Sequence, residues 1–274
     1  MKHLRQNFTI FTFLLMATIF AFSSCQNDVA TDDGGLSVTE AATYILSMTE
    51  SGTVKVSDSV NGSSCWDIPN ALKELYKTHP SVRVTLDLSG MNNLTFLPIW
   101  FFGEVYSLKS VILPDSLATI NRQAFYGCKN LETVEIPDTC TAIRKGAFQN
   151  CTSLSEITLP SHNVCLEEET FYNCKNLTTV NILDISDIST NAFLNCTSLS
   201  EIVLPEGVAE IWPGAFEGCT ALSKVTFAHP SDYYIRLHSE SKAEIDVTNP
   251  ATNAINLKDS NGEWFYETIS RNWD

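Results

Sequence analysis

The chain has 274 residues, 44% of them hydrophobic, and a formal net charge of −15 from 17 Lys and Arg against 32 Asp and Glu. This length indicates one or two domains, and the apolar fraction is large enough for a packed core. The acidic excess argues against nucleic acid and against an anionic membrane face as partners, because both attract proteins through Lys and Arg.

The first 25 residues predict an export signal. Lys2 and Arg5 precede the apolar run FTIFTFLLMATIFAF, and two serines then lead to Cys25. The run is shorter than the roughly 20 residues of a membrane span, which favours a secretory signal. Phe22-Ser-Ser-Cys25 resembles a bacterial lipobox, in which Cys25 becomes the lipidated first residue, although Phe22 departs from the usual aliphatic residue. Ordinary cleavage that leaves Cys25 a free thiol is the alternative.

The next segments predict a tether and a cap. Residues 26–39 are polar, acidic and contain glycine, as in a flexible tether. Residues 40–93 predict an α/β N-terminal cap: a helix capped by Thr39, a strand over 52–57, a helix over about 66–77, and a strand over 82–88. A repeat array needs such a cap, because its end coil leaves an apolar face and an open sheet edge.

Residues 94–227 repeat the motif I-x-x-x-A-F-x-x-C-x-x-L-x-x-V-x-I-P. Its phenylalanines recur every 22–23 residues, and a cysteine follows each by three; the phenylalanines are Phe125, Phe148, Phe171, Phe193 and Phe216. One earlier coil has Phe102, with Val105 in place of the cysteine. A fixed period of this length is typical of leucine-rich solenoids, and it predicts about six coils.

This spacing predicts the fold class: a leucine-rich-repeat solenoid, mostly β, with one short helical turn per coil. Val134 and Ile136 point inward from a short strand, and a second extended piece begins near Ile143. The turn Ala147–Cys151 directs Phe148 into the core, so the stacked phenylalanines form a spine. After Phe227 the register is lost, and residues 228–274, with short alternating stretches and an aromatic end, predict a β-rich C-terminal cap.

The repeats resemble the BspA-like (treponemal-type) leucine-rich repeat over residues 94–227. The flanks are also similar to lipoproteins of the treponemal branch, at residues 41–46, 50–56, 85–89 and 244–254. The resemblance implies a surface or outer-membrane lipoprotein that binds host matrix proteins such as fibronectin or fibrinogen, or that mediates coaggregation between cells. It carries over no binding residue.

The nine cysteines favour a structural role. Five of them occupy one column of the repeat, no C-x-x-C pair occurs, and the five histidines share no ligand spacing with them, so we expect no metal site. Buried free cysteine packs as a small hydrophobe, which predicts a core ladder. Cys140 and Cys165 fall on adjacent coils two positions out of register, and either a disulfide or two thiols fits them.

No catalytic motif is present, and the sequence therefore predicts a protein that is not an enzyme and needs no cofactor. The H-E-x-x-H, G-x-S-x-G, Walker and dinucleotide-binding glycine patterns are absent from the sequence. Asp259-Ser-Asn-Gly-Glu matches only a fragment of a calcium loop and reads as a turn.

The outward positions of the first strand form the candidate binding face. We define its two columns as follows: the first is Ser110, Thr133, Glu156, Thr179, Glu201 and Lys224, and the second is Ile112, Glu135, Thr158, Asn181, Val203 and Thr226. Solvated surface residues are one interpretation, and a contact surface for a partner protein is the other, since solenoids use such repeated faces. Trp100 and Trp212 flank the second extended piece of their coils, where they serve either as core or coil-edge packing or as binding aromatics.

The leading hypothesis is a lipid-anchored, non-enzymatic protein at the outer membrane or cell surface. It binds host matrix or cell-surface proteins or mediates coaggregation between cells. The alternative is a structural, envelope-organising lipoprotein that faces the periplasm and has no host ligand.

Overall fold

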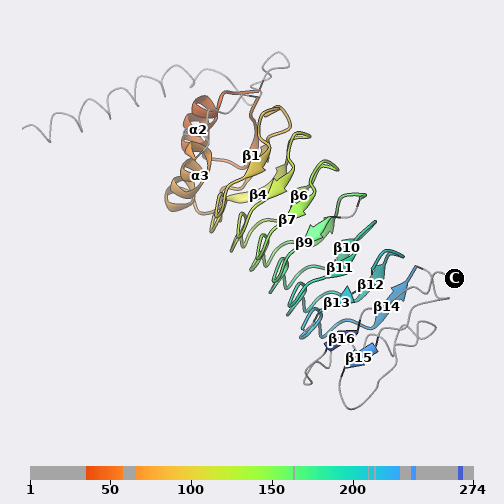
Figure 1. Ribbon diagram of the computed structural model, residues 1–274. Coiled ribbons are helices and arrows are strands. Elements are labelled where there is room, and N and C mark those ends of the chain that lie inside the picture. The colour runs from red at the N-terminus through yellow and green to blue at the C-terminus, as the bar shows by residue number, and fades with distance from the viewer. Residues whose placement is uncertain are drawn as a thin grey trace, which may run out of the picture. The chain divides into compact units, whose positions relative to one another are not determined.

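The computed structural model describes residues 35–57, 66–162, 164–208, 210–212, 214–228, 236–238 and 265–267. Within the unit from Leu36 onward, two helices near its N-terminal end accompany a ladder of short parallel strands, whose first strand lies between the helices in the chain (Figure 1). The predicted signal, Cys25 and the tether as far as residue 34 lie outside the described residues.

The two helices are α2 (Val38–Ser47) and α3 (Asp67–Thr78), and they pack against each other. The prediction that Thr39 caps the first helix is wrong, because Ser37 is the N-cap. Its Oγ accepts from the Glu40 N–H, and the Glu40 carboxylate accepts from the Ser37 N–H at 3.0 Å. This reciprocal pair satisfies two N–H groups that a helix start leaves open, so it fixes the start one residue before Thr39.

The first parallel sheet runs along the coils and begins in the cap region. Its strand order is β1-β2-β4-β6, continued by the pairs β8-β10 and β12-β14. The bounds are β1 Gly52–Lys55, β2 Val84–Asp87, β4 Leu108–Ile112, β6 Thr133–Glu135, β8 Glu156–Thr158, β10 Thr179–Asn181, β12 Glu201–Leu204 and β14 Lys224–Phe227. Val82, Val84, Leu86 and Leu88 are buried as predicted. The expectation that the last strand before the repeats joins their sheet is confirmed, and β1 extends that sheet by one further strand.

A second ladder lies on the other side of each coil, and we call it the second strip. Its strands pair in the order β3-β5-β7-β9 and β11-β13. They are β3 Phe96–Leu97, β5 Thr119–Ile120, β7 Ala142–Ile143, β9 Cys165–Leu166, β11 Asp187–Ile188 and β13 Glu210–Ile211. Only two residues per coil are extended here, which suits the one inward aliphatic residue that the motif supplies.

A third set of inter-coil hydrogen bonds runs through the turn around each phenylalanine. The Phe125 N–H donates to the Ala147 carbonyl at 2.8 Å, and the Gly127 N–H donates to the Gln149 carbonyl at 2.8 Å. Within the coil, the Cys128 N–H donates to the Phe125 carbonyl three residues earlier. The predicted helical turn is therefore, in detail, a run of turns closed by hydrogen bonds between residues three apart, and its other backbone groups bond to the next coil.

Each coil places two residues in the left-handed region, two positions before and two after its phenylalanine. In the coil of Phe148 they are Gly146, with φ of 62°, and Asn150, also with φ of 62°. Glycine and asparagine tolerate this conformation at least cost, which explains the Gly or Asn before every repeat cysteine.

The core consists of stacked identical residues, as the period predicted. The six phenylalanines from Phe102 to Phe216 are buried, and successive ring centroids lie 5.1–5.5 Å apart. Each repeat cysteine thiol donates to the carbonyl of the phenylalanine one coil earlier, at 2.8 Å for Cys128 and 3.2 Å for Cys196. The thiols thus point alike and not at one another, which confirms a packing ladder.

The predicted C-terminal cap lies mostly outside the described residues. Two strands of it are described, β15 (Arg236–His238) and β16 (Phe265–Glu267), and they pair antiparallel. No helix in the described part of the chain is long and apolar enough to span a membrane.

Candidate binding face and comparison with known proteins

Strand register assembles the two outward columns of the first sheet. Ser110 lies beside Thr133, Glu156 beside Thr179, and Glu201 beside Lys224. In the second column the same pairings join Ile112 to Glu135, Thr158 to Asn181, and Val203 to Thr226. The predicted columns are therefore real neighbours in space, because each strand keeps the same register as the coil before it.

The columns carry a lateral network of polar contacts. Ser110 and Thr133 share a hydroxyl hydrogen bond at 2.7 Å. Asn181 Nδ2 donates to Glu156 Oε1 at 3.2 Å and to Thr158 Oγ1 at 3.0 Å, and Lys224 Nζ lies 3.1 Å from Glu201 Oε2. Exposed contacts of this kind stabilise a fold by little, so they hold side-chain positions more than they hold the coils together.

Exposure along the columns is uneven. Ser110, Ile112 and Thr226 are half-buried, and the other column members are exposed. Val203 is 51% exposed, although it is apolar and surrounded by polar side chains. The face offers carboxylates, hydroxyls and amides on a rigid backbone ladder, with one exposed aliphatic residue among them.

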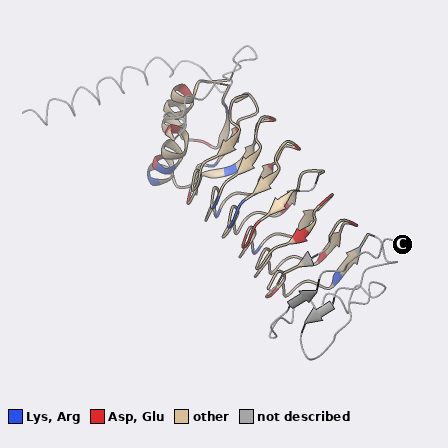
Figure 2. Ribbon diagram, in the orientation of Figure 1, with Lys and Arg blue, Asp and Glu red and all other residues tan. Residues whose placement is uncertain are grey.

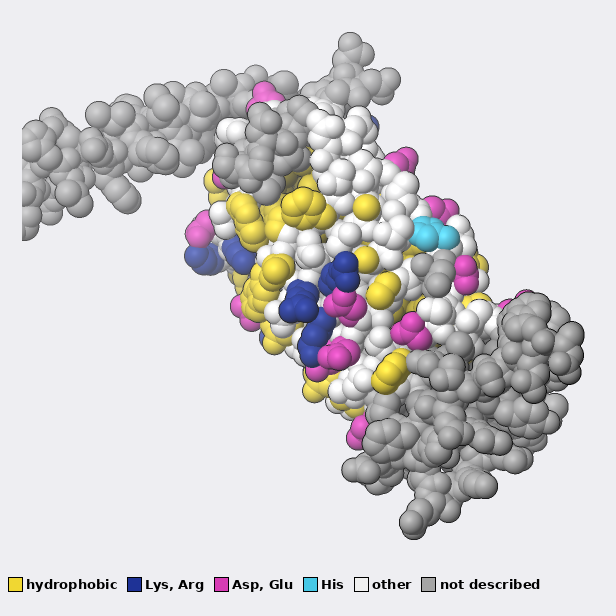
Figure 3. Space-filling model, in the orientation of Figure 1, with side chains coloured by type: hydrophobic (Ala, Val, Ile, Leu, Met, Phe, Trp, Pro, Cys, Tyr) yellow, Lys and Arg dark blue, Asp and Glu magenta, His cyan; other side chains and the backbone are white. Residues whose placement is uncertain are grey.

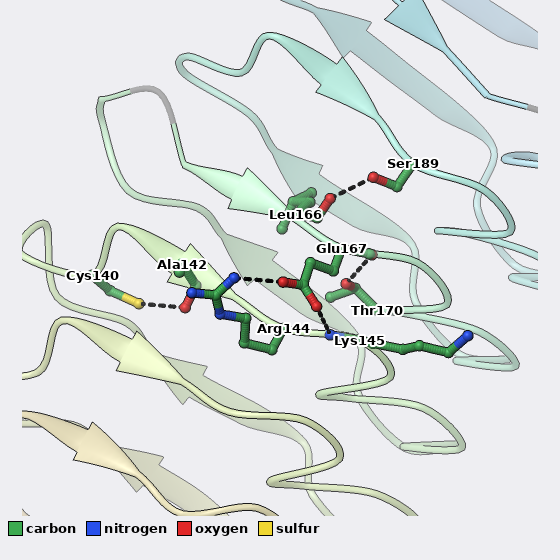
Figure 4. Close-up of polar contacts among 8 residues, drawn as sticks. All are labelled: Cys140, Ala142, Arg144, Lys145, Leu166, Glu167, Thr170 and Ser189. Atoms are coloured by element: carbon green, nitrogen blue, oxygen red, sulfur yellow. Dashed lines mark hydrogen bonds and ion pairs between the residues drawn. The ribbon is translucent and has the colours of Figure 1, made fainter.

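A second polar group, which the sequence reasoning did not single out, lies on the second strip. Arg144 Nη1 donates to Glu167 Oε1 at 2.6 Å, and the Lys145 N–H donates to Glu167 Oε2 at 2.9 Å (Figure 4). Lys145 Nζ extends away from that carboxylate to Glu168 Oε2 at 2.7 Å. Figure 2 shows such basic and acidic segments on neighbouring coils. Each of these ion pairs joins a basic and an acidic residue 23 positions apart in the sequence. That spacing equals one coil, so it is the sequence signal that could have predicted the pairs.

The Glu167 carboxyl accepts hydrogen bonds from two residues of the preceding coil. Partial burial favours its protonated form, but the hydrogen bonds from Arg144 and from the Lys145 N–H outweigh burial, and the pKa of Glu167 is lowered. It therefore stays ionised and links two adjacent coils.

The two tryptophans lie at the edge of the second strip and not in the core. Trp100 is 36% exposed and Trp212 is 46% exposed. The Trp100 indole N–H donates to Gln123 Oε1 at 2.7 Å, and its ring packs against Tyr126 at 5.0 Å between centroids. Of the two packing interpretations, coil-edge packing fits Trp100.

The thiols form no disulfide among the cysteines that the structure describes. Cys140 is buried and its thiol turns toward the Ala142 carbonyl, whereas Cys165 is exposed, and both are free. Burial raises the pKa of Cys128 and of Cys174 to about 12 each. Within the described residues, no group of three or more His, Cys, Asp or Glu side chains lies close enough to hold a metal ion.

Parallel coils, a ladder of phenylalanines and an open outward sheet face define a leucine-rich-repeat solenoid. The sequence pattern described as the BspA type leucine-rich repeat region matches residues 86–196 and 186–236, in six copies, and so covers more than half of the chain. The chain belongs to this family. Its members are in general non-enzymatic scaffolds that bind other proteins.

Solved structures of bacterial leucine-rich-repeat proteins are similar to this chain. A leucine-rich repeat protein from Bacteroides ovatus ATCC 8483 is 27% identical, with a TM-score of 0.48, over 53% of this chain and 37% of that protein. A leucine rich cell surface protein from Faecalibacterium prausnitzii A2-165 is 27% identical, with a TM-score of 0.48, over 62% of this chain and 46% of that protein.

The T. pallidum leucine-rich repeat protein is 31% identical, with a TM-score of 0.38, over 53% of this chain and 58% of that protein. The chain therefore spans less than half of the first two proteins. No curated protein matches this chain.

Proposed function

We propose that this protein is a lipid-anchored, extracytoplasmic binding protein that adheres to host matrix or cell-surface proteins, or to other cells, through the outward columns of its first sheet. The family membership makes protein binding the expected role, and the resemblance stated above makes fibronectin and fibrinogen the first partners to test. Cys25 supplies the anchor, and the signal sequence before it supplies the export route.

The observation that carries the proposal is the register of the outward columns. Glu156, Glu201 and Val203 are exposed on strands whose spacing the core fixes, so their mutual positions are set before a partner arrives. A preorganised face loses little entropy on binding. Repeated faces of this kind are the surfaces that solenoids present to partner proteins.

Binding of the purified protein to immobilised fibronectin and fibrinogen tests the face, with albumin as the negative control. We expect saturable binding, weakened at least tenfold by Glu156→Ala combined with Glu201→Ala. Glu168→Ala makes a matched control, because it removes an exposed carboxylate from the second strip and leaves the first sheet intact. Unchanged binding after replacement of the whole first column would show that the sheet face is not the site.

The anchor is tested separately by labelling cells with palmitate. We expect label in the wild-type protein and none in Cys25→Ala. Equal labelling of the two proteins would contradict lipidation at Cys25.

A second candidate function is a structural, envelope-organising lipoprotein that faces the periplasm. It is favoured by the same anchor motif at Cys25, which does not choose a membrane leaflet. Protease treatment of intact cells separates the two functions: cleavage of the protein supports the surface adhesin, and full protection supports the periplasmic role.

A further inference from the structure

The conformation of Trp100 is unusual for a residue of its size. Its φ is 61°, in the left-handed region, which is uncommon for any residue other than glycine and costly for a bulky side chain. The matching position of the other coils holds Gln123, Gly146, Glu169, Asn191 or Gly214. The fold therefore needs a left-handed residue at this position, but it does not need a tryptophan.

The surrounding residues hold the Trp100 ring in place while leaving part of it open. Tyr126 packs against the ring, Gln123 accepts from the indole nitrogen, and a Cβ atom added at Gly103 would overlap the six-membered ring. The absence of a side chain at Gly103 is thus what allows the ring to lie where it does. A strained residue fixed by several neighbours is a recurrent feature of binding sites.

Apolar side chains extend this surface. Phe96 is 52% exposed and Ile99 is 58% exposed, and both belong to the same coil as Trp100. Ile99 is among the most exposed large hydrophobic residues that the structure describes. We call the surface formed by Phe96, Ile99, Trp100, Arg122 and Tyr126 the Trp100 platform.

The platform carries one basic residue, Arg122, whose charge also acts on Lys145 and Glu167 of the following coils. Arg122 is exposed, its carbonyl accepts from the Trp100 N–H at 3.2 Å, and it makes no ion pair among the described residues. By the strand register it lies one coil beyond Ile99, with Lys145 one coil further. Figure 3 shows Lys and Arg side chains gathered on its visible face beside Asp and Glu, with hydrophobic side chains more frequent toward the N-terminal end.

We infer that the Trp100 platform binds an acidic segment of a partner protein that presents a carboxylate next to an apolar side chain. Arg122 pairs with the carboxylate, and Trp100 with Ile99 receives the apolar side chain. Aromatic and Arg residues are enriched among the side chains that dominate binding energy at protein interfaces. A polysaccharide fits less well, because Phe96 and Ile99 on the same coil are apolar and Gln123 already uses its carbonyl on the indole.

The inference rests on the proposed binding role, but it places the contact on a surface different from the outward columns. Fluorescence anisotropy of labelled 12-residue peptides tests it on the purified protein. One peptide alternates Asp or Glu with Leu or Phe; a second replaces the acids by Lys, a third replaces the apolar residues by Ser, and cellohexaose is the carbohydrate competitor. We expect saturable binding of the first peptide only, at least tenfold tighter than either control peptide.

Trp100→Gly is the decisive variant, because glycine suits the left-handed backbone and already occupies that position in two other coils. We expect it to fold with an unchanged or raised Tm and to lose at least tenfold in peptide affinity, as does Arg122→Gln. Trp212→Ala, which removes an exposed tryptophan at the other end of the strip, leaves peptide binding unchanged.

Each contrary result overturns the inference. The contrary results are equal affinity for all three peptides, displacement of the first peptide by cellohexaose, and unchanged peptide affinity in Trp100→Gly. The combined Glu156 and Glu201 variant keeps the two proposals apart: if matrix binding depends on those residues while no peptide binds, the sheet-face proposal stands and the platform proposal fails.

Discussion

The thiol of Cys151 donates to the carbonyl oxygen of Phe125, one coil earlier, at 3.0 Å. The same oxygen also accepts from the Cys128 N–H at 3.1 Å. The thiol therefore donates to the second lone pair of the Phe125 carbonyl oxygen. Sulfur is a weak donor, and this bond directs the side chain more than it stabilises the fold. The contribution of the cysteine column therefore comes mainly from packing, since Cys151 is fully buried.

This relationship predicts the outcome of substitutions at Cys151. Cys151→Ala should lower the free energy of unfolding by about 1–2 kcal/mol, because it removes buried volume. Cys151→Ser should cost at least as much, since a hydroxyl group is more expensive to bury than a thiol. Urea denaturation followed by circular dichroism measures both, with Cys165→Ser, at an exposed position, as the control. A serine variant as stable as the wild type would show that hydrogen bonding dominates.

The thiols should differ sharply in reactivity. Burial raises the pKa of Cys128 to about 12 and that of Cys140 to about 11, and the thiolate is the reactive form. Burial, with Asp187 and Glu167 nearby, also raises the pKa of Cys165, but that side chain is exposed to reagent.

Among the cysteines that the structure describes, we expect native alkylation at pH 8 to label Cys165 first. Mapping the labelled peptides by mass spectrometry reads this out, with a urea-unfolded sample as the fully labelled reference. Comparable native labelling of Cys128 would mean that its coil opens readily.

The period of the motif was sufficient to predict the core, because like residues in successive coils must stack. The spacing alone was enough to predict that Phe148 and Cys151 lie in the core. It was also enough to predict which residues form the outward columns. The helix start required a choice between two hydroxyl residues, and the Glu three residues after Ser37 is the local signal that decides it. The ion pair of Arg144 with Glu167 also follows from the period.

The Trp100 platform could not be derived in this way. Its form depends on a left-handed backbone at a residue that normally avoids it, and on the room that Gly103 leaves. Propensity rules argue against the first feature, and the second depends on where the indole ring lies, so only the three-dimensional arrangement identifies them. Within this chain, the coil of Trp100 departs from the motif in both respects.

Glu169 tests the left-handed positions directly. Its φ is 58°, at the place where the preceding coil has Gly146 and the coil two further along has Gly214. Glu169→Gly should raise stability by up to about 1 kcal/mol, because relief of the left-handed strain exceeds the added chain entropy of glycine. Glu169→Val should lower it by about 1–2 kcal/mol, since a β-branched residue fits this region worst. Thermal unfolding compares the pair; a glycine variant less stable than the valine variant would contradict the strain argument.

The Glu167 carboxylate should make part of the stability depend on pH. Its pKa is lowered in the folded protein, despite the opposing effect of partial burial, by Arg144 and by the Lys145 N–H. A group of this kind stabilises the fold fully above its unfolded pKa of about 4.3, and the contribution disappears as the pH falls through the lower folded pKa. Glu167→Gln should therefore cost about 1 kcal/mol at pH 7, the order expected for a partly exposed ion pair with one added N–H bond.

Urea titrations of wild type and Glu167→Gln at several pH values between 7 and 3 provide the measurement. The difference in unfolding free energy should hold from pH 7 to about 5 and then shrink as Glu167 takes up its proton. Glu132→Gln is the matched control, because its partner Lys109 lies 3.6 Å away and both side chains are about half exposed, which makes the pair worth little. A difference that stays constant down to pH 3 would assign the effect of Glu167→Gln to packing, because loss of an ionised hydrogen-bond acceptor must fade once the wild-type carboxyl is itself protonated.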